Sequence, residues 1–341
     1  MTGEVKPIYI SIDAMGGDNA PGAVVEGCLR AIGRQDGFRL QLLGDGAEIR
    51  RLLDAHGYKG DRVDVVNATQ SIGSDEVPTK AIKEKKDSPI VVGLNNLKTK
   101  KADAFISAGN TGALLTGAML VTGRIRGVNR PALAPMLPTA GGVSMLIDAG
   151  LSTSCKLINY EQFARIGSIY MREVYNIKSP KVGLLNVGVE ENKGTEIVKE
   201  AYGRLSALDD INFIGNIEGR DLTGGKCDVA VCDGFVGNVV LKCYESVGSF
   251  IFGAVVDVFK KNFVNKLAAG ILKKDIKGFF KRFDYEEYGG TPILGVNGPV
   301  FKVHGNANAR TVMYAIDRAV DFIRTPTLER LRECFAGRPE G

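Results

Sequence analysis

The sequence predicts an α/β fold in which helices cover both faces of a largely parallel sheet. Short apolar runs rich in β-branched residues alternate along the chain with segments that have helical periodicity. Each apolar run stops at Gly, Asp or Asn, and no internal repeat or long Gly/Ser/Pro linker divides the chain. Such alternation is typical of parallel sheets joined by crossover helices. We therefore expect one two-lobed domain over residues 1–330.

The expected strands and helices follow one another in order. Apolar runs predict strands at Ile8–Ile12, Leu40–Leu43, Ala104–Ser107, Met145–Ile147, Val182–Leu185 and Val229–Cys232. Apolar residues at helical spacing predict helices at Gly22–Ile32, Ala47–His56, Tyr160–Tyr175 and Lys193–Leu205. In such sheets, ligands bind outside the carboxyl ends of the strands, where helix N-termini offer free N–H groups to anions. The loops after the strands are therefore the place to search for a site.

Composition excludes several classes of protein. A chain of 341 residues with 44% hydrophobic and 24% charged residues buries a sizeable core, and it has no run approaching the roughly 18 consecutive apolar residues of a membrane-spanning helix. Its N-terminus lacks the apolar core of a secretory signal. The six cysteines form no CxxC pair, and two histidines are too few for a His-rich metal site. We expect a cytoplasmic enzyme with reduced cysteines, no metal and no cofactor.

The loop after the first expected strand contains paired glycines. It reads Asp13-Ala14-Met15-Gly16-Gly17-Asp18 and continues into Asn19-Ala20-Pro21. Glycine permits a positive φ and a close approach by a ligand, and proline suits the first turn of a helix. A tight turn without a binding role explains the same pattern, because neither a GxGxxG nor a Walker A motif is present.

Two further strand-end loops carry small and polar residues. Ser107-Ala108-Gly109-Asn110-Thr111-Gly112-Ala113 opens a small-residue helix, so its N–H groups and hydroxyls are suited to a phosphate; N-capping by Asn110 or Thr111 is the structural alternative. Cys232-Asp233-Gly234-Phe235-Val236-Gly237-Asn238 ends a strand with an acid and places Asn238 on the following helix, with an Asx turn as the alternative.

Charged and titratable groups occur in two later segments. Leu185-Asn186-Val187-Gly188-Val189-Glu190-Glu191-Asn192-Lys193-Gly194 places carboxylates and an ammonium at a strand end, which a capping box with solvated charges also explains. His304 is a candidate for proton transfer or for binding a developing negative charge, although a lone histidine is more often structural. Four strand-end loops of similar chemistry together favour an anion site.

The net charge of +5 is concentrated in one segment. Residues 257–282 hold eight Lys/Arg against Asp257 and Asp275, a local +6 that leaves −1 for the remainder. Apolar and basic residues are interspersed over 241–285 as in one or two amphipathic helices.

This amphipathic basic arm has two compatible explanations. One is a dimer-interface helix with solvated lysines, and the other is a surface that contacts anionic lipid or an acidic carrier protein through Lys273, Lys274 and Lys277. The chain has no Trp, and the phenylalanines of the arm lie on its apolar face, so we expect no nucleic acid partner.

The order and spacing of these loops resemble the PlsX family of bacterial phosphate acyltransferases, which make acyl-phosphate from acyl carrier protein thioesters. The resemblance runs from about Ile8 to Phe322. The segments that carry it are Asp13-Ala14-Met15-Gly16-Gly17-Asp18 with Ala20-Pro21, Ser107-Ala108-Gly109-Asn110-Thr111-Gly112, Arg130-Pro131-Ala132-Leu133, Gly183-Leu184-Leu185-Asn186-Val187-Gly188, Cys232-Asp233-Gly234-Phe235-Val236-Gly237-Asn238 and His304-Gly305.

The resemblance implies a fold similar to that of phosphotransacetylases and isocitrate-dehydrogenase-like enzymes. It also implies a homodimer in phospholipid synthesis, with acyl carrier protein and inorganic phosphate as substrates and a membrane glycerol-phosphate acyltransferase as a further partner. Interface helices with hydrophobic tips are associated in that family with peripheral membrane attachment. We therefore expect weak, reversible binding to anionic bilayers at the inner face of the cell membrane.

One segment departs from the family pattern. After Asp148-Ala149-Gly150 the family usually has Ala-Asn-x-Asp, whereas this chain reads Leu151-Ser152-Thr153-Ser154. Two hydroxyls thus replace an amide and a carboxylate. If those groups orient phosphate in relatives, this chain compensates elsewhere or works with altered efficiency, and neither Ser152 nor Ser154 is assigned a catalytic role.

The chemistry that the resemblance implies needs no covalent enzyme intermediate. A thioester is already activated, so phosphate attacks it directly when it is held in line with the carbonyl and the oxyanion is stabilised. We expect phosphate to be bound by the four residues Gly16, Gly17, Asn110 and Thr111.

The remaining candidate residues belong to the transfer itself. Lys193 supplies positive charge, and His304 or Asn186 supports the oxyanion or the leaving thiolate. A carboxylate that faces phosphate repels it unless it is protonated or paired. The acids and one amide are therefore expected to orient neighbouring donors: Asp233, Asp13, Asp18 and Asn238.

Two other functions fit the sequence. One is a phosphotransacetylase-like enzyme that uses acyl-coenzyme A; a dehydrogenase on the same fold is disfavoured, because no glycine fingerprint is followed about 20 residues later by a ribose-binding acid. The other is a catalytically reduced scaffold that binds lipid or carrier protein, for which the segment Ser152–Ser154 is the only support.

Overall fold

The computed structural model describes residues 7–73, 75–282 and 289–338. They form two compact units that interleave along the chain. Unit 1 comprises Met1–Ala134, Ile169–Lys178 and Tyr288–Gly341, and unit 2 comprises Pro135–Ser168 and Ser179–Glu287. Each unit contains its own sheet, so the predicted α/β class is confirmed. That the two units act as a single domain over residues 1–330 stays a prediction.

The described part of unit 1 is built on a seven-stranded sheet. Its elements are β1 (Ile8–Asp13), α1 (Gly22–Arg34), β2 (Phe38–Gly44), α2 (Gly46–Ala55), β3 (Val63–Asn67), α3 (Pro78–Glu84), α4 (Pro89–Lys98), β4 (Ala104–Ser107), α5 (Thr111–Gly117), the π-helix η1 (Ala118–Thr122), β5 (Ala132–Leu133), β11 (Thr291–Leu294), β12 (Val300–Lys302), α11 (Ala309–Arg324) and α12 (Thr327–Phe335). The strand order is β3-β2-β1-β4-β12-β11-β5.

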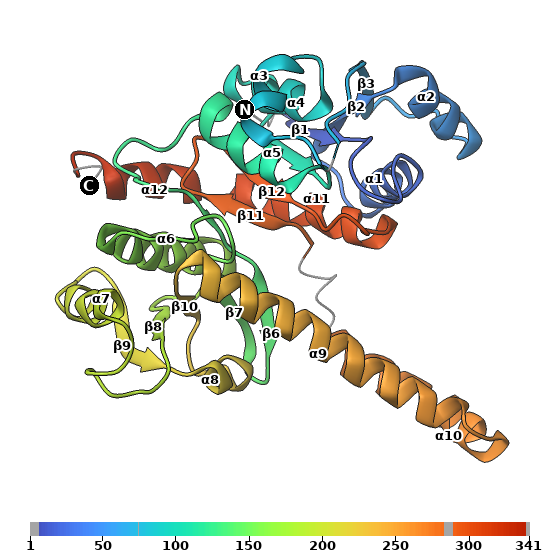
Figure 1. Cartoon of the computed structure of the whole chain (residues 1–341). Helices are drawn as coiled ribbons and strands as arrows, with labels where there is room; N and C mark the ends of the chain where they lie inside the picture. The colour runs from blue at the N-terminus through green and yellow to red at the C-terminus, as the bar shows by residue number, and fades with distance from the viewer. Residues whose placement is uncertain (1–6, 74, 283–288, 339–341) are drawn as a thin grey trace, which may run out of the picture. The chain divides into compact units, whose positions relative to one another are not determined.

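Helices cover both faces of this sheet. α1 and α11 pack together on one face, whereas α4 packs on β1, β2 and β4 from the other (Figure 1). Close packing depends on glycine: a Cβ at Gly27 in α1 would lie 2.6 Å from the carbonyl oxygen of Ala309 in α11. Likewise a Cβ at Gly93 in α4 would overlap the ring of Phe105 in β4. Small residues at these positions let the helices approach the sheet and one another.

The strand pairing of unit 1 creates a topological switch point. β1 pairs in parallel with β2 on one side and with β4 on the other, and β4 pairs in parallel with β12. The connection from β1 leads to β2, while β4 is reached later through α3 and α4. The loops after β1 and β4 therefore leave neighbouring strands at the carboxyl edge of the sheet, where open α/β sheets bind ligands.

The described part of unit 2 is built on a five-stranded sheet with a helical extension. Its strands are β6 (Met136–Thr139), β7 (Gly142–Ile147), β8 (Lys181–Leu185), β9 (Asn212–Ile217) and β10 (Val229–Val231). Its helices are α7 (Glu196–Ser206), α8 (Gly219–Gly224), α9 (Gly234–Lys260), α10 (Phe263–Arg282) and most of α6 (Leu157–Tyr175). The order is β6-β7-β10-β8-β9, parallel except for β6.

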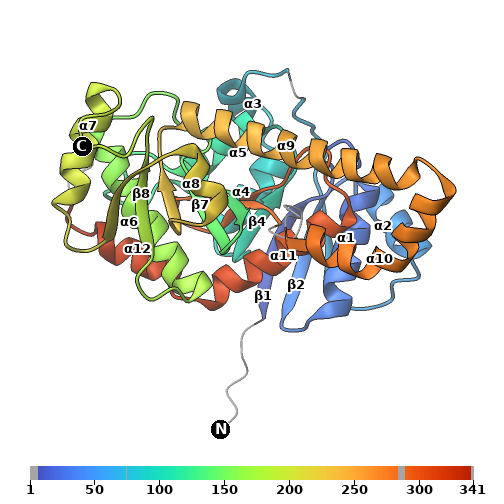
Figure 2. The ribbon, with the colours of Figure 1, turned by 90° about the horizontal axis from the view of Figure 1, so that it is seen from below.

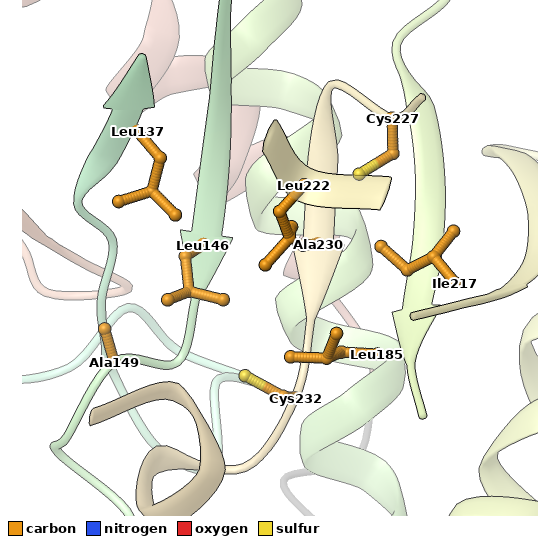
Figure 3. Packing of buried hydrophobic residues seen from close by; sticks show 9 residues of the cluster. All are labelled: Leu137, Leu146, Ala149, Leu185, Ile217, Leu222, Cys227, Ala230 and Cys232. Carbon is orange, nitrogen blue, oxygen red and sulfur yellow. The ribbon is translucent and has the colours of Figure 1, made fainter. Parts of the chain in front are cut away.

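A cluster of buried apolar side chains lies on one face of this second sheet (Figure 3). Leu146 of β7, Ala230 of β10 and Ile217 of β9 are fully buried, and Leu222 of α8 covers them. Burial of a leucine or isoleucine side chain contributes roughly 1.5–3 kcal/mol. The start of α9 joins the cluster through Val240, Leu241 and Tyr244.

Beyond Tyr244, α9 extends away from the sheet, and α10 packs back against α9 (Figure 2). The arm expected over 241–285 is thus formed by most of α9 and by α10, while residues 283–285 lie outside the described part. Lys274 is exposed, whereas the side chains of Lys273 and Lys277 lie outside the described residues.

Among the described residues, α9 is the one helix long and apolar enough to cross a membrane. The sequence predicts no membrane-spanning helix, because no run of consecutive apolar residues is long enough. In α9 single polar residues interrupt the apolar ones, but the helix as a whole remains apolar. The apolar stretch is not buried inside the chain. Length and composition alone do not assign α9 to a membrane.

Candidate active site

A buried hydroxyl joins the loops that follow β1 and β4. Ser107 Oγ donates a hydrogen bond to the carboxylate of Asp13 over 2.7 Å and accepts one from the Gly109 amide over 3.0 Å. Asp13 also accepts the Met15 amide over 3.1 Å. Both Asp13 and Ser107 are buried. The last residues of two neighbouring strands thereby fix the loops that leave them.

The paired glycines are required where these loops meet. A Cβ on Gly16 would lie 2.5 Å from the amide nitrogen of Gly109 and 2.6 Å from the carboxylate of Asp13. Gly17 has φ +98°, and a Cβ on it would lie 2.8 Å from the carbonyl oxygen of Gly305. The predicted positive φ is confirmed at Gly17, whereas the close approach of a ligand stays a prediction. What approaches the glycines in this structure is backbone of the other two loops.

The third loop follows β12 and contains His304. The Asp18 amide donates to the Gly305 carbonyl over 2.7 Å, and the Asn19 carboxamide donates to the carbonyls of Asn306 and Ala307, each over 3.1 Å. His304 is exposed. The sequence-predicted residues of unit 1 are therefore gathered at one edge of its sheet.

The N-terminus of α5 is capped by Asn110. Its carboxamide oxygen accepts the Ala113 amide over 2.9 Å, and its nitrogen donates to the Gly73 carbonyl over 2.7 Å. The N-capping alternative considered from the sequence is thus what this side chain does. Thr111 is exposed on the first turn, where the amides of Thr111 and Gly112 precede the capped one.

The three loops offer backbone amides, and no lysine or arginine side chain, to an anion. Burial raises the pKa of the Asp13 carboxyl, and hydrogen bonds from Ser107, Met15 and Gly16 oppose that rise. Within the described part of the chain, Asp13 makes no ion pair, and Asp18 is exposed. The loops supply N–H groups and two acids, so positive charge for a phosphate comes from elsewhere.

In unit 2 the loop after β8 is closed by Asn186. Its side chain donates to the Lys193 carbonyl over 3.0 Å and accepts the Val187 amide over 2.8 Å. Gly194 has φ +93°, and a Cβ there would lie 2.5 Å from the Asn186 carboxamide oxygen. Lys193 is exposed on this loop and forms no ion pair with a described residue.

The predicted helix over Lys193–Leu205 is wrong at its start. α7 begins at Glu196, with Thr195 at the N-cap position. Gly194 has a positive φ, which is incompatible with the first turn of a helix. Its backbone packs directly against the Asn186 carboxamide, which leaves no room for a Cβ. Lys193 therefore lies in a loop.

Asp148 and Asp233 hold the loops after β7 and β10. The buried carboxylate of Asp148 accepts the amides of Leu151 and Ser152, the latter over 2.6 Å. Asp233 caps α9 by accepting the Val236 amide over 2.9 Å. Asp233 is thus an N-cap, whereas the alternative considered from the sequence was an Asx turn.

Tyr160 of α6 lies near Asp233. Burial and, next, the negative charge of Asp233 raise the pKa of the Tyr160 phenol. On α9, Asn238 lies against Gly150, whose hypothetical Cβ would be 3.4 Å from the Asn238 carboxamide oxygen. Asp233 and Asn238 thus lie around the same turn, and their role in orienting donors stays a prediction.

The departure from the family pattern leaves this turn intact. Ser152 is buried, and its backbone makes the contacts: its amide donates to Asp148 and its carbonyl accepts the Gly234 amide over 2.8 Å. Ser154 is exposed. The backbone contacts of position 152 are compatible with serine or asparagine.

Three residues that contribute to these loops were missed from the sequence. Asp148 follows an expected strand, so the strand-end rule that selected Asp233 also applies to it. Ser107 was quoted within a motif but given no role of its own. Tyr160 carries no signal in the sequence, because its partner is 73 residues away along the chain. In the part of the chain that is described, no three His, Cys or acidic side chains are grouped as a metal ion requires.

Comparison with known proteins identifies the family. A family model described as "Fatty acid synthesis protein" matches residues 8–330. The phosphate acyltransferase of Acetivibrio thermocellus is 52% identical, over 96% of this chain and 96% of that protein. The phosphate acyltransferase of Alkaliphilus oremlandii is 47% identical, over 95% and 96%. The chain belongs to the PlsX family. It is a phosphate acyltransferase, as the resemblance predicted.

Solved structures confirm the fold expected of a PlsX protein. A phosphotransacetylase from Streptococcus pyogenes superposes with a TM-score of 0.62 at 15% identity, covering 93% of this chain and 94% of that one. The EutD phosphotransacetylase from Staphylococcus aureus gives 0.61 at 14% identity, covering 94% and 95%. At these identities the likeness concerns the fold alone.

Replacing Asp13 by Asn should change how stability depends on pH. Because burial raises the pKa of Asp13 above its ordinary value of 3.8, the folded chain keeps this proton to higher pH than the unfolded chain does. The wild type therefore loses stability as pH rises from near 3.8 through the raised pKa, whereas Asp13→Asn lacks this loss. Urea unfolding of both proteins between pH 4 and 8 measures it. A stability difference that does not vary with pH would contradict the assignment.

Proposed function

We propose that this phosphate acyltransferase takes its acyl group from an acyl carrier protein thioester, for phospholipid synthesis. An oxygen of hydrogen phosphate attacks the thioester carbonyl, the carbon–sulfur bond breaks, and the phosphate proton passes to the departing thiolate. The products are acyl-phosphate and free carrier protein. The observation that most supports a phosphate site is the convergence of three glycine-bearing loops where β1, β4 and β12 end.

Unit 1 is assigned the phosphate. Gly17 and Thr111 offer backbone N–H groups at the edge of the sheet, and a helix N-terminus favours an anion. Gly16, whose amide donates to Asp13, holds the loop. The Asn110 side chain is occupied by Ala113 and Gly73, so its part in binding is to hold the loop. Asp13 and Asp18 organise the loop through hydrogen bonds and do not contact the phosphate.

The other catalytic roles are assigned from the chemical properties of the side chains. Lys193 supplies positive charge, which stabilises charge on the phosphate and on the oxyanion. His304 is exposed next to the same loops and is suited to protonating the leaving thiolate. Asn186 sets the loop that carries Lys193, while Asp233 and Asn238 set the neighbouring turn.

Two alternatives remain distinct from this proposal. An enzyme that uses acyl-coenzyme A would share the phosphate loops, and only the thioester carrier would differ. A catalytically reduced scaffold would follow if the segment Ser152–Ser154 had removed an essential group. The intact backbone contacts of Ser152 favour an active enzyme.

The direct test is formation of acyl-phosphate. The purified enzyme, incubated with a long-chain acyl carrier protein thioester and inorganic phosphate, should give a product that hydroxylamine traps. Lys193→Ala and His304→Ala should each lower kcat/KM by about 10- to 100-fold. Matched controls are Lys226→Ala, which precedes β10, and His56→Ala, at the end of α2.

Each outcome of this assay bears on a different part of the proposal. No product at any phosphate concentration would overturn the main claim. Product from acyl-coenzyme A but not from the carrier thioester would favour the phosphotransacetylase-like alternative. Full activity in both variants would remove Lys193 and His304 from the mechanism.

We also propose a cytoplasmic homodimer that attaches reversibly to the inner face of the cell membrane. Large apolar side chains are exposed along the arm, including Phe250 at 75% and Phe263 at 80%. The lysines of the arm are suited to an anionic bilayer. This location would place the product near a membrane glycerol-phosphate acyltransferase.

Neutralising Lys273, Lys274 and Lys277 to Gln should weaken attachment to membranes. Each lysine near an anionic surface contributes about 1 kcal/mol, so loss of three should release most of the bound protein. Co-sedimentation with vesicles containing phosphatidylglycerol measures this, and neutral vesicles serve as the control. Equal binding of wild type and variant would refute the electrostatic part.

A further inference from the structure

We propose that the surface of α3 docks the acidic carrier protein, so that the thioester is delivered beside the phosphate loops of unit 1. This surface consists of Val77, Lys80, Lys83 and Lys86. The inference rests on the carrier thioester being the substrate, as proposed above. It differs from the assignment of carrier contacts to Lys273, Lys274 and Lys277 on the arm.

The α3 surface carries three exposed lysines. Of the acids near them, Glu76 pairs with Lys85 and Asp87 accepts hydrogen bonds from Thr69, while Asp75 and Glu84 are exposed. From Pro78 to Lys86 the chain has four lysines against one acid, Glu84. Lys80, Lys83 and Lys86 are exposed, and among the described residues none of them forms an ion pair. Ala81 and Ile82 on the opposite face are buried. The helix therefore presents its lysines to solvent while its apolar side fixes its orientation.

The fourth lysine holds the preceding segment in place. Lys85 Nζ lies 2.6 Å from the carboxylate of Glu76 and also donates to the carbonyl of Ser71. Glu76 in turn accepts the Gly73 amide. Its charge is used within the fold. The Lys86 ammonium also donates to the Ile82 carbonyl over 3.0 Å, which leaves Lys80 and Lys83 for a partner.

This ordered segment contacts the phosphate loop directly. The Gly73 carbonyl accepts the Asn110 carboxamide over 2.7 Å. At the start of α3, Pro78 lies against the first turn of α5: a Cβ on Gly112 would be 2.6 Å from the Pro78 ring. A protein bound on α3 is therefore adjacent to the loop that we assign to phosphate. A carrier protein that holds its thioester on a flexible arm has to dock close to the phosphate loop, so that the thioester reaches the phosphate.

The chemistry of the surface fits an acidic protein that has a small apolar contact. Val77 is 62% exposed at the N-cap position of α3 and stands beside the lysines in sequence. An exposed apolar side chain with a charged rim is typical of a transient protein interface. Charge complementarity of this kind mainly accelerates association. An anionic membrane is the occupant we assign to the arm, where the exposed apolar residues are more numerous and larger.

The test compares two thioesters in a doubly charge-reversed enzyme. Lys80→Glu/Lys83→Glu should lower kcat/KM for the acyl carrier protein thioester by about tenfold or more, chiefly through KM, because attraction becomes repulsion. Its activity on acyl-pantetheine, an uncharged thioester with the same reacting group, should match the wild type. The dependence of kcat/KM on salt should also weaken with the carrier substrate.

A matched control carries the same charge change at the other end of the sheet. Lys98→Glu/Lys101→Glu alters two exposed lysines that precede β4, whereas the phosphate loop follows β4. It should leave kcat/KM within about twofold of the wild type for both substrates.

The remaining outcomes separate the docking surface from the proposed function. Unchanged kcat/KM of Lys80→Glu/Lys83→Glu with the carrier substrate would overturn the assignment of α3. An equal loss with both thioesters would show damage to the phosphate loops and would also overturn it. If the wild type fails with the carrier thioester but turns over acyl-pantetheine, the proposed substrate itself is wrong.

Discussion

The hydrogen bonds of Ser107 to Asp13 and Gly109 are the contacts on which the candidate phosphate site depends. Burying a carboxylate without a cation is costly unless several donors satisfy it, and here one hydroxyl and two backbone amides do so. Because Ser107 also accepts the Gly109 amide, the loops after β1 and β4 are fixed relative to one another. Position 16 then has to be glycine, because a Cβ on Gly16 would clash with both loops.

Unit 2 uses the same principle with different groups. Asp148 and Asp233 accept backbone amides at the ends of β7 and β10, and Asn186 closes the loop after β8. Polar side chains that are used to hold loops leave few groups for the substrate. Lys156 and Lys193 are exposed cations in the described part of these loops, and Lys193 is the one assigned to the reaction.

Much of this arrangement follows from local sequence. Apolar runs that end at Gly, Asp or Asn located β1, β4 and β8, because strand propensity and turn chemistry are properties of neighbouring residues. The start of α7 was misplaced, since the left-handed Gly194 is set by its fit over Asn186. The capping role of Asn110 was weighed correctly as an alternative, whereas the placement of Tyr160 near Asp233 depends on tertiary packing that no local pattern encodes.

The central claim is that phosphate binds to backbone amides at the edge of the seven-stranded sheet. Amide NMR during titration with inorganic phosphate measures it most directly. The account predicts saturable shifts at Gly17 and Thr111 in the wild type, and their loss in Ser107→Ala, in which the two loops are no longer joined. Saturable shifts confined to the loop of Asn186 and Lys193, with none at the glycines, would contradict it.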